Sequence, residues 1–323
     1  MHAAILPSQA APTGSRAFLH AIASLPAQDR RPLSLRLHVP SLLSCAGGAA
    51  TLDTYLAYLK RELAMHAVLF AGTRSLRQLR FDGIGAAGLS NAQLTGLLTH
   101  LRAGFRFMGD DGADVEAAVD PGGLPQARLA SLRRQGFNAI RFEYGGAPGT
   151  HQALPLLAGA ARDAGLRTVC VALAYGMPGQ GVGQLRRMLD ATLAAAPDRV
   201  LLRHRPTAGA ASGAAAQRLR QHCIERLDRA GYAITGAGQF VRAGAKPDPA
   251  SFEYYPGTHL VGCGAGALGA VGPVLYRNAE ALRDYYALID RDQVPVARVL
   301  QRMRREQTRP YLMQVKDFQD ADQ

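Results

Sequence analysis

Short apolar runs alternate with amphipathic stretches between residues 33 and 203, and this alternation constrains the fold more than any other feature of the sequence. A series of strands that are each followed by a helix is typical of a parallel α/β protein. Six such units predict a complete or partial β/α barrel, whose site lies where the strands end. The predicted strands are Leu33–His38, Leu76–Phe81, Val115–Val119, Phe137–Phe142, Thr168–Leu173 and Arg199–Arg203.

Helices are predicted between these strands from the spacing of apolar residues. Asp53–Met65 carries leucines at helical spacing, and Ser90 followed by Gln93 forms a capping box that predicts a helix start. Further helices are expected over Pro125–Gln135, His151–Ala164 and Gly183–Ala195.

The pattern changes after residue 206, where a Gly/Ala/Ser stretch precedes a helix and several short strand-like pieces. We therefore expect a barrel over residues 17–206 and a small α+β extension packed on it over residues 207–313. The first 16 residues and residues 314–323 are polar or lack periodicity, so both ends are expected to be mobile.

Composition narrows the functional classes. No run of about 18 uncharged apolar residues occurs and the start lacks the pattern of a signal peptide, so we expect a cytoplasmic protein without a membrane span. The four cysteines are far apart, which indicates neither a zinc ribbon nor a disulfide framework. The net charge of +12, mostly from arginine, favours an anionic partner, although a GC-rich genome would produce the same usage. Tryptophan is absent and no basic segment is interleaved with aromatics, so nucleic acid is not an expected partner.

The segment Arg31–Pro40 resembles the first strand of oxygen-independent coproporphyrinogen III dehydrogenases and the related haem chaperones, which are radical S-adenosylmethionine (SAM) proteins. Similar phrases follow in order over roughly residues 17 to 300. They include Tyr55–Glu62, Val119–Pro121, Gly136–Asn138, Tyr175–Gln180, Pro197–Arg199, Gly262–Ala265 and Tyr276–Asn278. The resemblance implies a partial, six-stranded barrel of the radical SAM type.

The sequence departs from this family at the cofactor sites. The family follows its first strand with three cysteines that hold a [4Fe-4S] cluster. Here the loop Ser41–Ala49 contains one cysteine, Cys45, and alignment places Leu42, Ala46 and Ala49 at the ligand positions. Positions that contact SAM in the family hold Ile84, Ala118, Gly145 and Ala172. We therefore expect that the protein has lost both the cluster and SAM and that it requires no cofactor.

Arginines accompany these losses within or just after four of the predicted strands. They are Arg36, Arg80, Arg141, Arg203 and Arg205. If they point inward, they form a pocket for an anionic small molecule such as a tetrapyrrole. Alternatively, they pair with Asp82, Glu116 and Glu143 and fill the vacated space, because an empty cavity is costly.

Haem or a porphyrin is a further candidate ligand, with His38, Cys45, His204 and His259 as conceivable iron ligands. No local haem motif supports any of them, and His38 is better explained as part of the family framework.

Three functional hypotheses remain. The first is a non-catalytic homologue of the coproporphyrinogen dehydrogenases, repurposed as a binding or partner protein in tetrapyrrole metabolism; any protein partner is unknown. The second is an enzyme with a cluster-independent activity on an anionic small molecule. The third, an active coproporphyrinogen dehydrogenase, requires the three cluster ligands that the loop lacks.

Overall fold

The computed structural model forms two compact units, each built from discontinuous parts of the chain. Unit 1 comprises residues 1–77, 99–108 and 252–323, and unit 2 comprises residues 78–98 and 109–251. The structure describes residues 14–40, 48–70, 75–83, 86–108, 113–147, 150–205, 213–236, 238–245 and 258–301.

Five parallel strands form the centre of unit 2 in the order β2 (Ser75–Gly83, of which Gln78–Gly83 belong to this unit), β4 (Asp114–Val119), β5 (Ala139–Tyr144), β6 (Thr168–Tyr175) and β7 (Arg199–His204). Their registers pair Arg80 with Glu116, Arg141 with Cys170 and Cys170 with Arg199. All but the first residue of β6 are buried, as expected for a strand covered on both faces of a parallel sheet.

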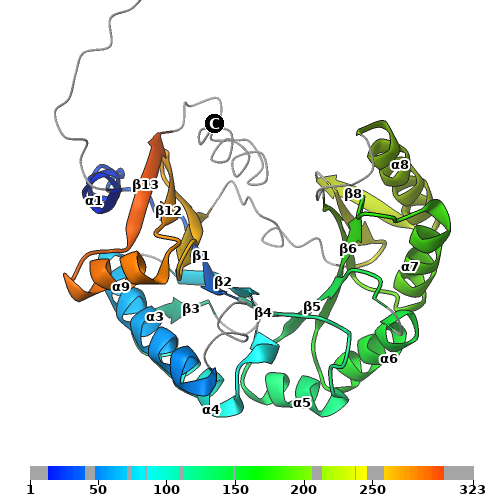
Figure 1. Ribbon diagram of the computed structural model, residues 1–323, viewed down its shortest axis with the longest axis horizontal. Helices are drawn as coiled ribbons and strands as arrows, with labels where there is room; N and C mark the ends of the chain where they lie inside the picture. Colours follow the sequence, from blue (N-terminus) through cyan, green and yellow to red (C-terminus); the bar gives the residue numbers. More distant parts are fainter. Residues whose placement is uncertain are drawn as a thin grey trace, which may run out of the picture. The chain divides into compact units, whose positions relative to one another are not determined.

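Helices alternate with these strands and cover one face of them (Figure 1). They are α4 (Asn91–Gly104), α5 (Gln126–Arg134), α6 (Thr150–Asp163), α7 (Val182–Ala194) and α8 (Gly213–Arg229), with a short 3₁₀ turn, η1 (Ala86–Gly88), before α4. The predicted capping box begins α4, since the Gln93 amide donates to Ser90 Oγ at 3.2 Å and the Ser90 amide donates to Gln93 Oε1 at 2.9 Å.

Two antiparallel strands complete unit 2. β9 (Gln239–Arg242) pairs with β7, and β8 (Tyr232–Gly236) pairs with β9. These strands belong to the predicted extension, but they continue the sheet by hydrogen bonding at its edge.

Unit 1 contains β1 (Leu33–Val39), which pairs in parallel with β10 (His259–Cys263). The antiparallel strands β11 (Leu268–Val271), β12 (Val274–Asn278) and β13 (Val296–Gln301) follow β10 in order. Three helices, α1 (Gly14–Ala23), α3 (Gly48–Phe70) and α9 (Leu282–Asp290), and the short β3 (Arg106–Phe107) belong to the same unit.

The end of β10 and the residue that follows the strand require glycine. A Cβ at Gly264, whose φ is +109°, would lie 2.1 Å from the His38 carbonyl oxygen, and one at Gly262 would lie 2.1 Å from the Leu268 carbonyl oxygen. Close backbone packing therefore explains these glycines.

The predicted α/β class and all six predicted strands are confirmed, with boundaries that differ by at most two residues. The two compact units are built from other ranges, since β1 pairs with the late strand β10 while β9 pairs with β7. The expected boundary between barrel and extension after residue 206 stays a prediction. Residues 14–16, expected in a mobile terminus, belong to α1, where Ser15 Oγ donates to the Val294 carbonyl at 2.7 Å. Residues 1–13 and 314–323 lie outside the described residues. Within the described ranges, no helix has the length and apolarity needed to cross a membrane.

Candidate functional site

Charged side chains occupy alternate positions on the parallel strands of unit 2. Because successive side chains of a strand point to opposite faces, residues two apart share one face of the sheet. This face carries Arg80 and Asp82 of β2, Glu116 of β4, Arg141 and Glu143 of β5, and Arg199 and Arg203 of β7. The opposite face carries apolar residues such as Phe81, Phe142 and Val171, all fully buried.

Arg141 is the centre of the charged group. Its Nη1 lies 2.8 Å from Glu116 Oε1, its Nε donates to Glu143 Oε1 at 2.7 Å, and its Nη2 lies 3.5 Å from Asp82 Oδ1. Arg80 Nε lies 3.4 Å from the same Glu116 oxygen. Arg80, Glu116 and Arg141 are each buried to 97% or more. Three carboxylates therefore surround one buried guanidinium, which stabilises the charge of each partner.

The pKa values in this group follow from burial and from the neighbouring charges. Burial opposes ionisation of Glu116, but Arg80, Arg141 and Arg199 outweigh it and lower the pKa of this carboxyl. Burial also disfavours the charge on Arg141, but Glu116, Glu143 and Asp82 raise its pKa above the usual arginine value. Burial, reinforced by Glu116, raises the pKa of the Cys170 thiol to about 12. Glu116 and Arg141 are therefore ionised at neutral pH, and Cys170 is a thiol.

A cavity of about 380 Å³ lies at the carboxyl ends of β5, β6 and β7. The cavity is bordered by three residues with little or no side chain, Gly145, Ala172 and Ala174. A Cβ added to Gly145 would meet no atom within 4 Å. The rest of the lining is formed by Asp120, Glu143, Tyr144, Met177, Pro178, Arg203 and Arg205. The notable point is that Gly145 and Ala172 are two of the positions at which the resemblance implies a lost SAM contact.

The charges that line the cavity have both signs. Arg203 Nε lies 3.9 Å and Arg205 Nη2 lies 4.0 Å from Glu143 Oε2, and the two arginine side chains are 22% and 60% exposed. Both distances are those of ion pairs that are longer than a hydrogen bond. The second carboxylate, Asp120, accepts a hydrogen bond from the Gly122 amide at 2.7 Å. The cavity thus presents guanidinium donors beside carboxylate acceptors.

The rim of the cavity is held by the turn after β6. Gln180 Oε1 accepts from the Gly176 amide at 2.7 Å, and its Nε2 donates to the Ala174 carbonyl at 3.2 Å. These bonds fix the turn that carries Met177 and Pro178. The wall includes Tyr144, whose hydroxyl is hydrogen-bonded to His151 Nδ1. Burial raises the pKa of this tyrosine to about 12.

The predicted arginines divide into two groups. Arg80 and Arg141 form the ion pairs that we considered as an alternative to ligand binding, whereas Arg203 and Arg205 line the cavity. Arg36 lies on β1 in unit 1. Ligand binding by these residues stays a prediction.

The candidate haem ligands are also dispersed. His38 is on β1 of unit 1, and Cys45 and Ile84 lie outside the described residues. His204 is exposed and stacks on Tyr175, with 5.2 Å between ring centroids. His259 is fully buried, its Nδ1 accepts from the Gly272 amide at 3.1 Å, and its Nε2 lies 3.1 Å from Asp29 Oδ2. Both ring nitrogens of His259 are therefore occupied.

The described donor set does not fit the family's iron-sulfur cluster. Cys170, Cys223 and Cys263 lie on β6, α8 and β10, and all three are buried. Within the described ranges, the one group of three potential ligands close enough to share an ion is Glu62, His66 and Cys263, which offers a single thiol. A cluster that leaves one iron open requires three thiolates, which this group does not supply.

Sequence reasoning missed several of the residues that line the cavity, namely Asp120, Tyr144, Ala174, Met177 and Pro178. Their common signal is position, because each lies at or just beyond the carboxyl end of a parallel strand. It also missed the group formed by Glu62, His66 and Cys263, for which the i,i+4 spacing of the first two was visible.

Comparison with known proteins gives a consistent set of relatives, although no family model matches the sequence. Oxygen-independent coproporphyrinogen III oxidase from Salmonella typhimurium is 30% identical over 318 residues, covering 85% of this chain and 68% of that protein. The oxidase of the same name from Pseudomonas aeruginosa is 27% identical, covering 83% of this chain and 68% of that protein. The solved structure of coproporphyrinogen III oxidase (HemN) from Escherichia coli, described as a radical SAM enzyme, matches with a TM-score of 0.74 at 26% identity, covering 89% of this chain and 75% of that one. The fold expected from the resemblance is thereby confirmed.

Proposed function

Because the chain belongs to the oxygen-independent coproporphyrinogen III oxidase family, we propose that it is a non-catalytic homologue repurposed to bind a carboxylate-bearing small molecule. The proposed site is the cavity at the carboxyl ends of β5, β6 and β7 in unit 2. A tetrapyrrole is the proposed class of ligand, and a cytoplasmic location stays a prediction.

The observation that carries this proposal is that the cavity lies at positions where contacts to the family's cofactor have been lost. The cluster loop Ser41–Ala49 keeps one cysteine, and the cavity opens at Gly145 and Ala172, where the resemblance implies lost SAM contacts. On the same face of the sheet, the ion pairs of Arg80, Glu116 and Arg141 fill the space between the side chains. The carboxyl ends of β5, β6 and β7 are not filled in this way. The charged face of unit 2 is therefore filled by ion pairs in one part and hollowed by a cavity in another.

The chemistry of the cavity favours a ligand that combines a carboxylate with an N–H donor. Arg203 and Arg205 can bind a carboxylate, while Glu143 and Asp120 can accept from N–H groups. Tetrapyrroles carry propionates beside pyrrole nitrogens, so they offer both. A cavity of about 380 Å³ is at the small end for ligand sites, so it would take a propionate-bearing edge of the macrocycle.

The non-catalytic part of the proposal is tested by anaerobic reconstitution with iron and sulfide. We expect no stoichiometric cluster absorbance in the visible region and no cleavage of SAM. A cluster that forms at one per chain and cleaves SAM would refute the proposal. The C45A variant provides a further check, because adventitious iron held by a single thiolate would disappear with it.

The binding part is tested by titration with coproporphyrin III, followed by its absorbance and fluorescence. The R203M/R205M variant should bind at least about tenfold more weakly, because a hydrogen bond to a charged group contributes about 1.5–3 kcal/mol. The matched control is R186M/R187M, which removes two exposed arginines of α7. Equal affinity for the parent and R203M/R205M, or no binding by the parent, would remove the tetrapyrrole proposal.

A second candidate function is an enzyme that acts on an anionic molecule in the same cavity without a cluster. The hydrogen bond between Tyr144 and His151 favours it, because a tyrosine that shares a proton with a histidine can serve acid/base chemistry. Screening carboxylate substrates with the parent and Y144F tests this candidate. Turnover that Y144F lowers at least about a hundredfold would support it, and turnover that Y144F leaves unchanged would not.

A further inference from the structure

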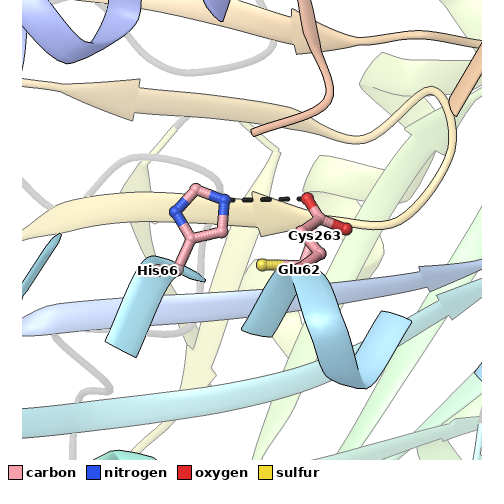
Figure 2. Close-up of side chains that lie close together, drawn as sticks. All are labelled: Glu62, His66 and Cys263. Carbon is pink, nitrogen blue, oxygen red and sulfur yellow. Dashed lines mark ion pairs between the residues drawn. The ribbon is translucent and has the colours of Figure 1, made fainter. Parts of the chain in front are cut away.

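A second group of chemically reactive side chains lies in unit 1 and shares no residue with the lining of the proposed binding cavity. Glu62 and His66 are one helical turn apart on α3, and Cys263 is the last residue of β10. One ligand atom from each of the three lies within 4.8 Å of the others, and all three side chains are buried. Figure 2 shows both helix residues turned toward the strand that carries Cys263.

His66 carries the first observation that points to a ligand. It is fully buried, and within the described part of the chain neither of its ring nitrogens has a hydrogen-bond partner. Its Nε2 lies 3.6 Å from Glu62 Oε1, which is beyond a hydrogen bond. Phe18 packs edge-to-face at 5.8 Å, and Phe70 stacks at 6.4 Å between ring centroids. Leaving a buried imidazole without a hydrogen-bond partner is unfavourable, and an ion bound to a ring nitrogen would offset this cost.

Glu62 is oriented by three donors. The Gly264 amide and the Tyr285 hydroxyl donate to its Oε2 at 2.7 and 2.6 Å, and Asn278 Nδ2 donates to its Oε1 at 2.6 Å. A carboxylate offers about four lone-pair sites, so one remains on Oε1, the oxygen nearest His66. Carboxylates that bind metal ions are typically fixed by such additional hydrogen bonds.

The donor set is one thiol, one imidazole and one carboxylate. Zn²⁺ accepts all three types at about 2.0–2.3 Å and often keeps a fourth position for water. Because the three ligand atoms lie within 4.8 Å of one another, an ion placed between them would lie at most about 2.8 Å from each. Reaching zinc distances would therefore require each ligand atom to move by at most roughly 0.5–0.8 Å.

We propose that Glu62, His66 and Cys263 form a buried zinc site that joins α3 to β10 within unit 1. Binding replaces the S–H bond of Cys263 by an S–Zn bond, and the thiol proton leaves to solvent. The thiolate and the Glu62 carboxylate together balance the two positive charges of the ion, so the occupied site is neutral. No electron transfer is involved, and the site is independent of the tetrapyrrole proposal.

Because all three ligands are buried, the test uses the full chain unfolded and then refolded with Co²⁺ as a spectroscopic substitute for Zn²⁺. We expect about one ion per chain, with a thiolate-to-cobalt charge-transfer band in the near ultraviolet and visible bands of tetrahedral cobalt. Zinc should displace the cobalt with loss of both bands. Refolded parent protein that retains less than about a tenth of an ion per chain after desalting would overturn the proposal.

Variants identify the thiolate. C263A should lose the charge-transfer band and most of the bound ion, whereas C223A, which removes a buried thiol on α8, and C45A should keep both. Retention of the band in C263A, or its loss in C45A or C223A, would refute the assignment. If C263A does not refold, H66F replaces it, since an intact thiol without the imidazole should bind the ion at least about tenfold more weakly.

Discussion

Replacing Glu116 by glutamine tests the view that the charged inner face of unit 2 is held by its ion pairs. The substitution keeps the side-chain volume but removes the negative charge 2.8 Å from Arg141 and 3.4 Å from Arg80. Breaking a buried pair by removing one partner costs about 3–5 kcal/mol, because the remaining charge is left uncompensated. Arg141 keeps Glu143 at 2.7 Å, so we expect a loss near the lower end, about 3 kcal/mol.

The assay is urea denaturation followed by far-ultraviolet circular dichroism, because the chain has no tryptophan to report unfolding. E225Q is the matched control, since Glu225 and Arg229 form an exposed pair on α8, worth about 0–1 kcal/mol. The reasoning is refuted if the unfolding midpoint of E116Q coincides with that of E225Q.

The pH dependence gives the same prediction a second signature. The folded protein lowers the pKa of Glu116 below its ordinary value of 4.5, so its charge contributes stability above that pH and the contribution is lost as the pH falls below it. The difference between parent and E116Q should therefore be largest at neutral pH and shrink in acid. A difference that grows below pH 4.5 would contradict the assigned sign.

Three further substitutions, one of them with a matched control, test individual features. Gly145→Leu should abolish ligand binding with little change in the midpoint of thermal unfolding, because a Cβ there meets no atom within 4 Å; a destabilised protein that still binds would contradict this. Gly264→Ala should lower the free energy of unfolding by more than about 1–3 kcal/mol through backbone strain and the clash with the His38 carbonyl, whereas Gly159→Ala in α6 should raise it by roughly 0.5–1 kcal/mol; equal effects in urea would refute the glycine argument. Ser90→Ala should cost about 1 kcal/mol in the same assay by removing the cap of α4, and an unchanged midpoint would show that the cap contributes nothing.

The local structure of unit 2 could be predicted because each element follows from its own residues. The apolar run of β6 and the Ser90–Gln93 capping box act within a few positions, and both appear as expected. The strands after residue 258 could not be predicted from the sequence in the same way. β10 and β11 are four or five residues long and contain glycines that sheet packing requires, so their sequence lacks the periodicity from which a strand is predicted.

The sequence by itself determined the α/β class, the positions of six strands along the chain, the family and the departure of the Ser41–Ala49 loop from its cluster motif. It also identified the arginines, but not their different roles. Tertiary structure decided that Arg141 is neutralised by three carboxylates while Arg203 and Arg205 line a cavity. The physical reason is that an arginine is buried only where partners from other strands offset its desolvation, and strand register, which brings those partners together, is a property of the assembled sheet.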